Sequence, residues 1–386
     1  MAKDQACISQ HSVYVYDRGG LSRFGQIKDI SRIWWERDRD GISEAEVVIS
    51  GRSCGRQRGE ISNYSAKRHE LVIFRGDERV WEGPISRIAD EGSRIVIAAK
   101  DVSWYLFGKA LSRTWDNSTN GDGATEVTTR FQNIINWELT HPRTIRAVGG
   151  GNVVLPAWES LSPPVNLLDH LTVHHFPNEA RTSAKTLASE MTVGQHLQNA
   201  ARSSGIDYTA VGRAIHIWDT SRSIGRTRTL TEADFFGNII ITEYGADHTQ
   251  AAYVAGMDGI YGSAGNPEYL DFYGPWETVY TAYNEEGSAG PTQSELDSQA
   301  SRNTSGRSPV PYEVRVPDNS SVRLSSSLSV NDLVPGVQVP LRATLNAKAY
   351  EQDQKIDHLR VTETSEGETV QVTLTPATRP DSDEEE

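Results

Sequence analysis

The stretch from residue 70 to residue 111 places the tightest limits on the fold, because it combines three strand patterns with one helical pattern. Apolar residues run together at 71–74, resume at 80–88 on either side of Pro84, and occupy 95–99. Gly76-Asp77 and Glu91-Gly92 separate these runs and are typical turn sequences. The stretch therefore predicts three consecutive strands in an antiparallel meander.

The hydrophobic period changes after residue 100. Val102, Tyr105 and Leu106 are spaced as on one face of a helix, with Asp101 placed to cap its start and Gly108 near its end. A meander closed by a helix buries one face of its sheet. We therefore expect residues 1–111 to form a first β-barrel domain closed by a helix.

The residues before this stretch also have strand character. Residues 11–16 alternate, and apolar runs follow at 27–35 and 45–49. Asp40-Gly41, between the last two runs, is a strong hairpin signal. Residues 51–59 are rich in glycine and arginine without a hydrophobic period, which predicts a loop.

Residues 112–234 have a mixed pattern and predict an α+β insert domain. Apolar positions at 126–139 have helical spacing. A second helix is expected to begin at its cap, Thr192, and to end at Gly205, with a hairpin of two strands over 206–218 after it.

Residues 235–378 return to strand patterns and predict a second β-barrel domain with one helix, at 294–306. Residues 238–244 and 251–256 are expected to pair with each other. The predicted fold class is thus mainly β with some α: two tube-like β-barrel domains plus a mixed α/β insert domain.

A long hairpin is expected to end the second barrel. Leu359 and Val361 alternate on one strand and face Val370, Val372 and Leu374 on the next. Residues 379–386 are an acidic tail of a composition typical of disorder.

Short motifs at four places along the chain resemble one protein family. They are W-E-G-P-I at 81–85, A-K-D-V-S-W-Y-L at 99–106, T-V-G-Q-H-L-Q-N-A-A-R-S-S-G-I-D-Y at 192–208 and D-L-V-P-G at 332–336. Together with the strand order over 11–376, they resemble the tail-hub proteins of long-tailed bacteriophages. These are the Tal-like baseplate hubs, often labelled minor tail proteins.

The resemblance implies a structural virion protein at the phage tail tip, made in the host cytoplasm. It implies a homotrimer in which two barrels per chain imitate six-fold symmetry, closing a ring around the DNA channel. The implied partners are a distal tail protein or tail tube, a tape-measure protein, and other tail-tip or receptor-binding proteins. The chain ends soon after its last predicted hairpin, so we expect no appended enzymatic domain and no enzyme.

Composition supports these expectations by exclusion. The net charge of −14 argues against a protein that binds DNA by neutralising phosphates, so DNA is expected to pass through without specific binding. No apolar run approaches the roughly 20 residues of a membrane span, and we expect no membrane insertion. The start of the chain lacks the apolar core of a signal peptide. Cys7 and Cys54 are too few for a disulfide framework.

A histidine cluster is the first candidate for chemistry. It comprises Asp169, His170, His174 and His175, and on a helix the spacing of His170 and His174 would place both imidazoles on one face for zinc. No third ligand is assigned, and no glutamate follows His170 as it does in H-E-x-x-H. We therefore expect ordinary histidines here, and no metal or cofactor.

Two further motifs fall short of a catalytic or metal site. Glu36, Asp38, Asp40 and Gly41 suggest a calcium loop, but the twelfth position is Val47, which cannot coordinate the ion. A hairpin turn is the better interpretation. Residues 262–265 depart from G-x-S-x-G, because Tyr261 stands two residues before Ser263. No catalytic residue is predicted.

Aromatic residues concentrate over 261–283. They are Tyr261, Tyr269, Phe272, Tyr273, Trp276, Tyr280 and Tyr283. Packing within a sheet or a subunit interface is the favoured interpretation. The alternatives are a carbohydrate-binding or cell-wall-degrading tail protein, and the adjacent hexameric distal tail protein. The sequence leaves open the host, the neighbouring proteins, the state of the channel before infection, and whether any loop binds sugar or metal.

Overall fold

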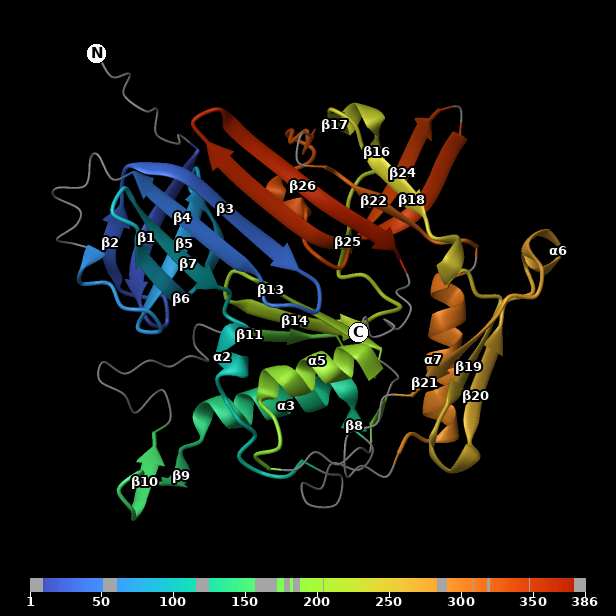
Figure 1. Ribbon diagram of the computed structural model, residues 1–386, viewed down its shortest axis with the longest axis horizontal. Coiled ribbons are helices and arrows are strands. Elements are labelled where there is room, and N and C mark those ends of the chain that lie inside the picture. Colours follow the sequence, from blue (N-terminus) through green and yellow to red (C-terminus); the bar gives the residue numbers. More distant parts are fainter. Residues whose placement is uncertain are drawn as a thin grey trace.

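Strands predominate and helices are few in the computed structural model (Figure 1). It describes residues 10–50, 61–115, 125–156, 172–176, 181–182, 188–203, 205–282, 290–307, 309–317, 320–346 and 348–377. The expected fold class, mainly β with some α, is confirmed. The predicted loop at 51–59, the acidic tail and both cysteines lie outside the described residues.

Strands predominate among the described residues of the N-terminal part, and a short helix follows them. These elements are β1 (His11–Asp17), β2 (Arg23–Ile27), β3 (Ile30–Asp38), β4 (Glu44–Ser50), β5 (His69–Arg75), β6 (Glu78–Asp90), β7 (Arg94–Lys100) and α2 (Trp104–Phe107). The predicted meander is present, since β6 pairs antiparallel with both β5 and β7. The predicted helix is a single turn, α2.

Strand β6 serves two sheet segments because it changes partner at Gly83-Pro84. Residues up to Pro84 pair with β5, and residues from Ile85 pair with β7. A Cβ atom on Gly83 would lie 1.9 Å from the Lys100 carbonyl oxygen, so only glycine fits this close approach of two backbones. The strand can therefore turn and still bury both faces.

The C-terminal part supplies the other half of the sheet. Its elements are β15 (Gly225–Arg226), β16 (Leu230–Thr231), η2 (Glu232–Asp234), β17 (Phe235–Phe236), β18 (Ile240–Glu243), β22 (Tyr312–Arg315), β23 (Ser321–Val322), η5 (Val330–Asp332), β24 (Val337–Leu345), β25 (Lys348–Thr364) and β26 (Gly367–Pro376). The predicted final hairpin is β25–β26, in which Leu359 lies opposite Val372 and Val361 opposite Val370. The period-two pattern thus set the register correctly.

One 14-stranded sheet joins the two parts. Its main path runs β18-β22-β26-β25-β3-β4-β7-β6-β5-β1-β2, with β15, β16 and β24 beside it. This path does not return to its start, so strand pairing among the described residues closes no barrel, and the expected closed barrels are not found. The physical reason is the pairing of β25. One edge of this strand pairs with β24 over its first half and with β3 over its second half, so β3 pairs with β25 instead of closing a barrel of N-terminal strands.

The middle part is a mixed α/β unit below this sheet (Figure 1). Its elements are β8 (Thr125–Glu126), α3 (Val127–Thr140), β9 (Arg143–Arg146), β10 (Asn152–Leu155), β11 (Thr172–His175), β12 (Arg181–Thr182), α5 (Val193–Ser203), β13 (Ile206–Val211) and β14 (Ala214–Asp219). Helices α3 and α5 and the hairpin β13–β14 agree with the sequence. The Glu126 side chain caps α3 by accepting from the amides of Thr128 and Thr129 at 2.8 Å.

A fourth group of elements was not expected as a unit. It comprises η3 (Gly245–Asp247), β19 (Ala251–Ala255), η4 (Met257–Gly259), β20 (Tyr261–Gly265), α6 (Leu270–Tyr273), β21 (Glu277–Thr281) and α7 (Gln293–Arg307). Strands β20, β19 and β21 form a sheet that α7 covers on one face, with Leu296 and Ala300 in a core of its own.

The predicted pairing of 238–244 with 251–256 is wrong, because β18 pairs with β22, and β19 with β20 and β21. The division of the chain after residues 111 and 234 stays a prediction. No helix among the described residues is both long enough and apolar enough to cross a membrane.

Candidate assembly interface

The seam between β3 and β25 joins segments more than 300 residues apart. Seven residue pairs are in antiparallel register, from Asp38 opposite His358 to Arg32 opposite Thr364. Trp35, opposite Val361, lies on the apolar face and is buried. The first and last parts of the chain therefore share backbone hydrogen bonds here and belong to one sheet.

The other face of the seam carries paired charges. Asp38 Oδ1 lies 2.5 Å from His358 Nδ1, and Glu36 Oε2 lies 3.7 Å from Arg360 Nη1. The Arg360 guanidinium also stacks over Trp34, 4.1 Å from the ring centroid. The seam is therefore cross-linked by side chains on this face in addition to its backbone bonds.

Burial shifts the pKa values of the acid–base groups on this face. It raises the pKa of Glu36 to about 7, and the neighbouring Asp38 carboxylate adds to the rise. For His358, burial lowers the pKa, but the hydrogen bond and charge of Asp38 outweigh it and the net pKa is raised. Protonation near neutral pH therefore stabilises this part of the seam.

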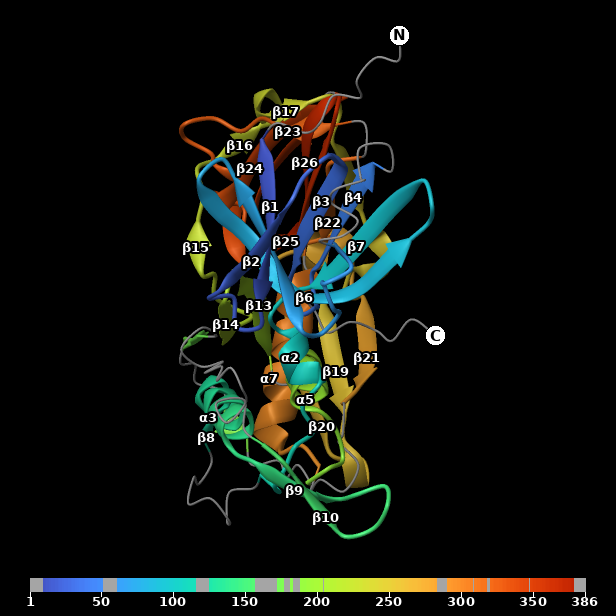
Figure 2. The same ribbon diagram turned by 90° about the vertical axis from the view of Figure 1, so that its left-hand side faces the viewer.

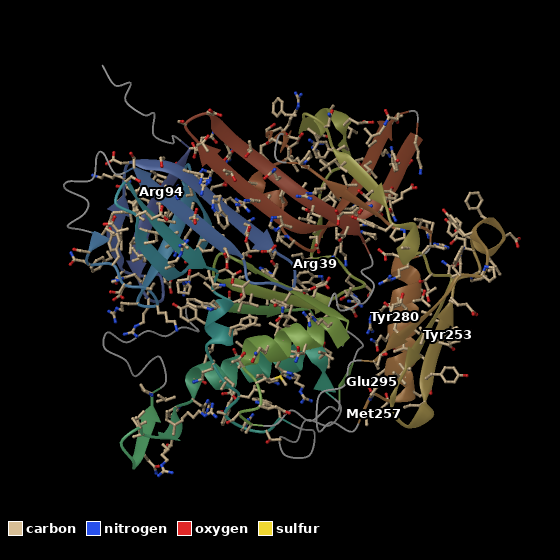
Figure 3. The ribbon with its side chains drawn as sticks, viewed as in Figure 1. Arg39, Arg94, Tyr253, Met257, Tyr280 and Glu295 are labelled. Carbon is tan, nitrogen blue, oxygen red and sulfur yellow. The ribbon has the colours of Figure 1, made fainter. Side chains whose placement is uncertain are left out.

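Arg39, in the β3–β4 turn, ties the seam to the middle part (Figure 3). Its guanidinium donates to Asp357 Oδ1 at 2.8 Å and to Thr375 Oγ1 at 2.9 Å, and lies 3.5 Å from Asp207 Oδ2. Asp207 also accepts from Thr220 Oγ1 at 2.9 Å. The Arg39 and Asp207 side chains are both buried.

The charge of Arg39 is maintained in spite of this burial. Burial alone lowers the pKa, but the carboxylates of Asp207 and Asp357 outweigh it and raise the pKa above the ordinary value. A buried cation with these bonds to three chain segments holds them at fixed positions.

A second buried ion-pair cluster joins the same hairpin β13–β14 to the N-terminal strands. Glu70 accepts from Arg213 Nη1 at 2.6 Å, from the Tyr105 hydroxyl at 2.5 Å and from the Gly19 amide at 2.8 Å. Arg213 Nη1 also lies 3.2 Å from Glu82 Oε2. The two clusters thus fix both ends of the hairpin.

A third contact fixes the far end of β25–β26. His11 Nδ1 lies 2.6 Å from Glu363 Oε2, and Trp35 Nε1 donates to His11 Nε2 at 3.1 Å. Arg75 donates to both carboxylate oxygens of Glu368 at 2.8 Å. A bidentate pair of this kind gives orientation as well as attraction.

The β9–β10 hairpin differs from these junctions because it projects from the body of the molecule. It is at the lower end in two perpendicular views (Figures 1 and 2). Its large apolar side chains are exposed, and they are Ile145, Val148, Val153, Val154 and Leu155.

The β20-β19-β21 sheet has one covered face and one open face. Tyr280 lies under α7 and is buried. The open face carries Tyr253, Tyr261 and Val279, of which Val279 is 71% exposed. Trp276, just before β21, is 61% exposed. Of the aromatic cluster predicted to pack in a sheet or interface, Tyr280 packs within this chain, whereas Tyr261, Phe272 and Trp276 are exposed.

The described residues also form a cavity of about 480 Å³. It lies between β17, β23 and β26 and is lined by Gln10, Phe236, Gly237, Ser320, Ser321, Val322, Leu324, Glu368, Thr369 and Val370. Glu368 is the one carboxylate in this lining, and it is paired with Arg75. The lining therefore does not provide the two carboxylates that glycoside hydrolysis uses.

The candidate histidine site does not form as its spacing suggested. His174 lies in β11, a strand, so the helical spacing with His170 does not apply, and Asp169 and His170 lie outside the described residues. The His174 ring stacks on His216, with the centroids 5.1 Å apart. Burial, with a smaller contribution from His174, lowers the pKa of His216 to about 4. No group of three metal-binding side chains occurs among the described residues.

The other two motifs have structural roles. The hairpin turn at Asp40-Gly41 is confirmed between β3 and β4, and Asp40 Oδ1 accepts from the Tyr208 amide at 2.7 Å. Ser263 lies within β20, in a strand rather than at a strand-to-helix turn. Sequence reasoning missed Arg39, Glu70 and Arg213, because one charged residue in a strand or turn carries no signal of its distant partner.

The topology above is the fold of prophage tail proteins. The 43 kDa tail protein of prophage MuSo2 from Shewanella oneidensis matches with a TM-score of 0.59 at 10% identity, covering 96% of this chain and 97% of that one. A tail protein from Neisseria meningitidis MC58 matches with 0.55 at 11% identity (95% and 97% covered). Prophage tail protein gp18 from Listeria monocytogenes EGD-e matches with 0.53 at 9% identity (95% of each).

The sequence matches no family model and no curated protein. The resemblance to phage tail proteins is therefore supported at the level of the fold. The narrower assignment to the tail-hub family stays a prediction.

Proposed function

We propose that this chain is a structural subunit of a bacteriophage-type tail. The observation that carries the proposal is the β3–β25 seam, with the ion pairs beside it. A tail component must keep its shape while its neighbours attach and move, and this seam makes one rigid sheet from both ends of the chain. The shared fold with prophage tail proteins over almost the whole chain supports the same conclusion.

We further propose that the chain acts as a trimeric hub at the tail tip, where it joins the tail tube to the tip. The hairpins β3–β4 and β25–β26 lie side by side across the seam. We propose that each belongs to one of two similar β units in the chain. Three copies then supply six such units, a number that matches the six-fold symmetry of the proposed tail tube. The proposed partners are a distal tail protein or tube protein, a tape-measure protein and receptor-binding proteins.

The hub surrounds a channel through which DNA passes in this proposal. The net charge of −14 supports sliding without binding, because acidic groups repel phosphates. We propose that acidic residues line the channel and that the chain is not an enzyme. An assembled ring whose channel wall is mainly arginine would contradict this part.

The mass and symmetry of the assembled particle test the hub. Light scattering should give three times 42.7 kDa, and electron microscopy should show a three-fold ring with a six-fold outline. Six copies with true six-fold symmetry would instead indicate a distal tail protein. A single copy at all concentrations would contradict any ring.

A second candidate function is carbohydrate binding, and exposed Tyr261, Phe272 and Trp276 favour it, because sugars stack on aromatic rings. Binding of the purified chain to host cell-wall polysaccharide measures it. Binding that is lost in Trp276→Ala would support this function over a purely structural one.

A further inference from the structure

The β9–β10 hairpin pairs over only four residue positions and is mostly exposed. It has four residues per strand, and all but Arg143 of these strand residues are exposed. An isolated two-stranded hairpin is at best marginally stable in water. Five exposed aliphatic side chains on such a hairpin therefore indicate a surface that another surface covers.

The charge of the hairpin is uniformly positive. Residues 141–156 contain Arg143 and Arg146 and no aspartate or glutamate, in a chain with an acidic excess. Arg143 donates to the Ala110 carbonyl at 3.4 Å and also bonds Ser189 in the body of the protein. Arg146 is exposed on the projecting part.

The open face of the β20-β19-β21 sheet has the complementary character. Its outward side chains Tyr253, Tyr261 and Val279 form an apolar surface, and Trp276 extends it. Glu277 lies on this face, where its carboxylate accepts from the Tyr253 hydroxyl at 3.3 Å, and Glu268 and Asp271 are exposed in the segment that joins β20 to β21. Strand β21 is at the edge of this sheet in the described part of the chain, so its outer backbone groups face away from the sheet.

The two surfaces lie on opposite sides of one molecule (Figure 1). The hairpin of a chain therefore cannot cover the open sheet face of the same chain. We propose that the β9–β10 hairpin of one copy packs on the open β20-β19-β21 face of the next copy, with Arg146 against Glu277 and Asp271. This inference rests on the proposed ring and names the surfaces that would hold it.

The contact is heterologous, since it joins two different patches. Repeated head to tail, it leaves one hairpin and one sheet face uncovered at the ends until the ring closes. Apolar contact between the aliphatic and aromatic side chains provides the stabilisation, and the charges select the partner.

Charge reversal on each side tests the pairing. Arg146→Glu and Glu277→Arg should each raise the concentration at which the assembly dissociates by at least tenfold, measured by light scattering over a dilution series. The double variant should regain most of that loss, because the two charges attract again. Arg94→Glu, at the exposed start of β7 and far from both surfaces, is the matched control and should leave assembly unchanged.

A mixing experiment tests the head-to-tail geometry. Val148→Asp blocks the hairpin and Val279→Asp blocks the sheet face, so each variant alone should be a single copy. An equimolar mixture should form a two-copy species and stop, since one intact contact remains. Below the concentration of assembly, circular dichroism of each variant must show the thermal midpoint of the unmodified chain, so that loss of assembly is not loss of folding.

The outcomes separate this inference from the hub itself. If Arg146→Glu and Val148→Asp form trimers as tightly as the unmodified chain, the inference fails while the trimer stands. If the unmodified chain is a single copy throughout, both fail. If Trp276→Ala abolishes polysaccharide binding and leaves the trimer intact, the open face is a sugar-binding surface and the inference is overturned.

Discussion

The seam and the β9–β10 hairpin are both built from antiparallel strands, yet they have opposite environments. At the seam, apolar side chains are buried and outward charges have partners within the chain. On the hairpin, apolar side chains are exposed. The comparison separates the part of the molecule that stabilises the fold from the part that we propose for assembly.

The largest effect on stability is expected at Arg39. Arg39→Ala leaves Asp207 buried without its cation, which should lower the free energy of unfolding by about 3–5 kcal/mol. Urea denaturation measures this. Arg94→Ala removes an ion pair in which both partners are exposed and should cause no measurable change (Figure 3). Equal effects of the two variants would remove the distinction between seam and periphery.

A matched pair of leucines gives the next largest effect. Leu359 in the seam is fully buried, whereas Leu155 in the hairpin is 45% exposed. Leu359→Ala should lower the free energy of unfolding by about 2–5 kcal/mol, because it leaves a cavity. Leu155→Ala should change it by less than about 0.5 kcal/mol when measured below the concentration of assembly.

The pH dependence of the seam is expected to be smaller. Burial, with a further contribution from Asp38, raises the pKa of Glu36 in the fold from its ordinary value to about 7, so its protonated form favours the fold. Its contribution is complete below the unfolded pKa and is lost as pH rises from there through about 7. The raised pKa of His358 acts in the same direction, because its protonated form also favours the fold.

Glu36→Gln isolates this effect. At pH 5 the variant should match the unmodified chain, and at pH 8 it should be more stable by about 2 kcal/mol, because no charge is then buried. Denaturation at both pH values measures the difference. Glu91→Gln, on an exposed turn, is the control and should show no such pH dependence. A variant that loses stability at pH 8 would mean that the charged Glu36 stabilises the seam.

The smallest effect is expected on the open sheet face. Val279→Thr keeps the shape of an exposed side chain and should change the free energy of unfolding by less than about 0.5 kcal/mol. Val254→Thr, on the covered face under α7, should cost more, because it buries a hydroxyl. Similar costs for both would show that the open face is covered within a single chain.

The sequence was informative wherever partners are neighbours along the chain. The strands at 94–100, the hairpins β13–β14 and β25–β26, and the helices α3, α5 and α7 follow from local period, caps and turns. It was misleading for 238–256, where β18 pairs with β22 about 70 residues away instead of with β19. Adjacent strand patterns favour a hairpin, but here β19 pairs with β20 and β21 in a separate sheet that α7 covers.

By itself the sequence determined the strand at 94–100, the hairpins β13–β14 and β25–β26 and the helices α3, α5 and α7, because these depend on spacings of two to four residues. Only the tertiary structure decided that β3 pairs with β25, that Arg39 meets Asp207 and Asp357, and that the β9–β10 hairpin is left uncovered. Strand edges offer the same backbone groups everywhere. Which edges meet therefore depends on how the whole chain packs, and no local pattern records it.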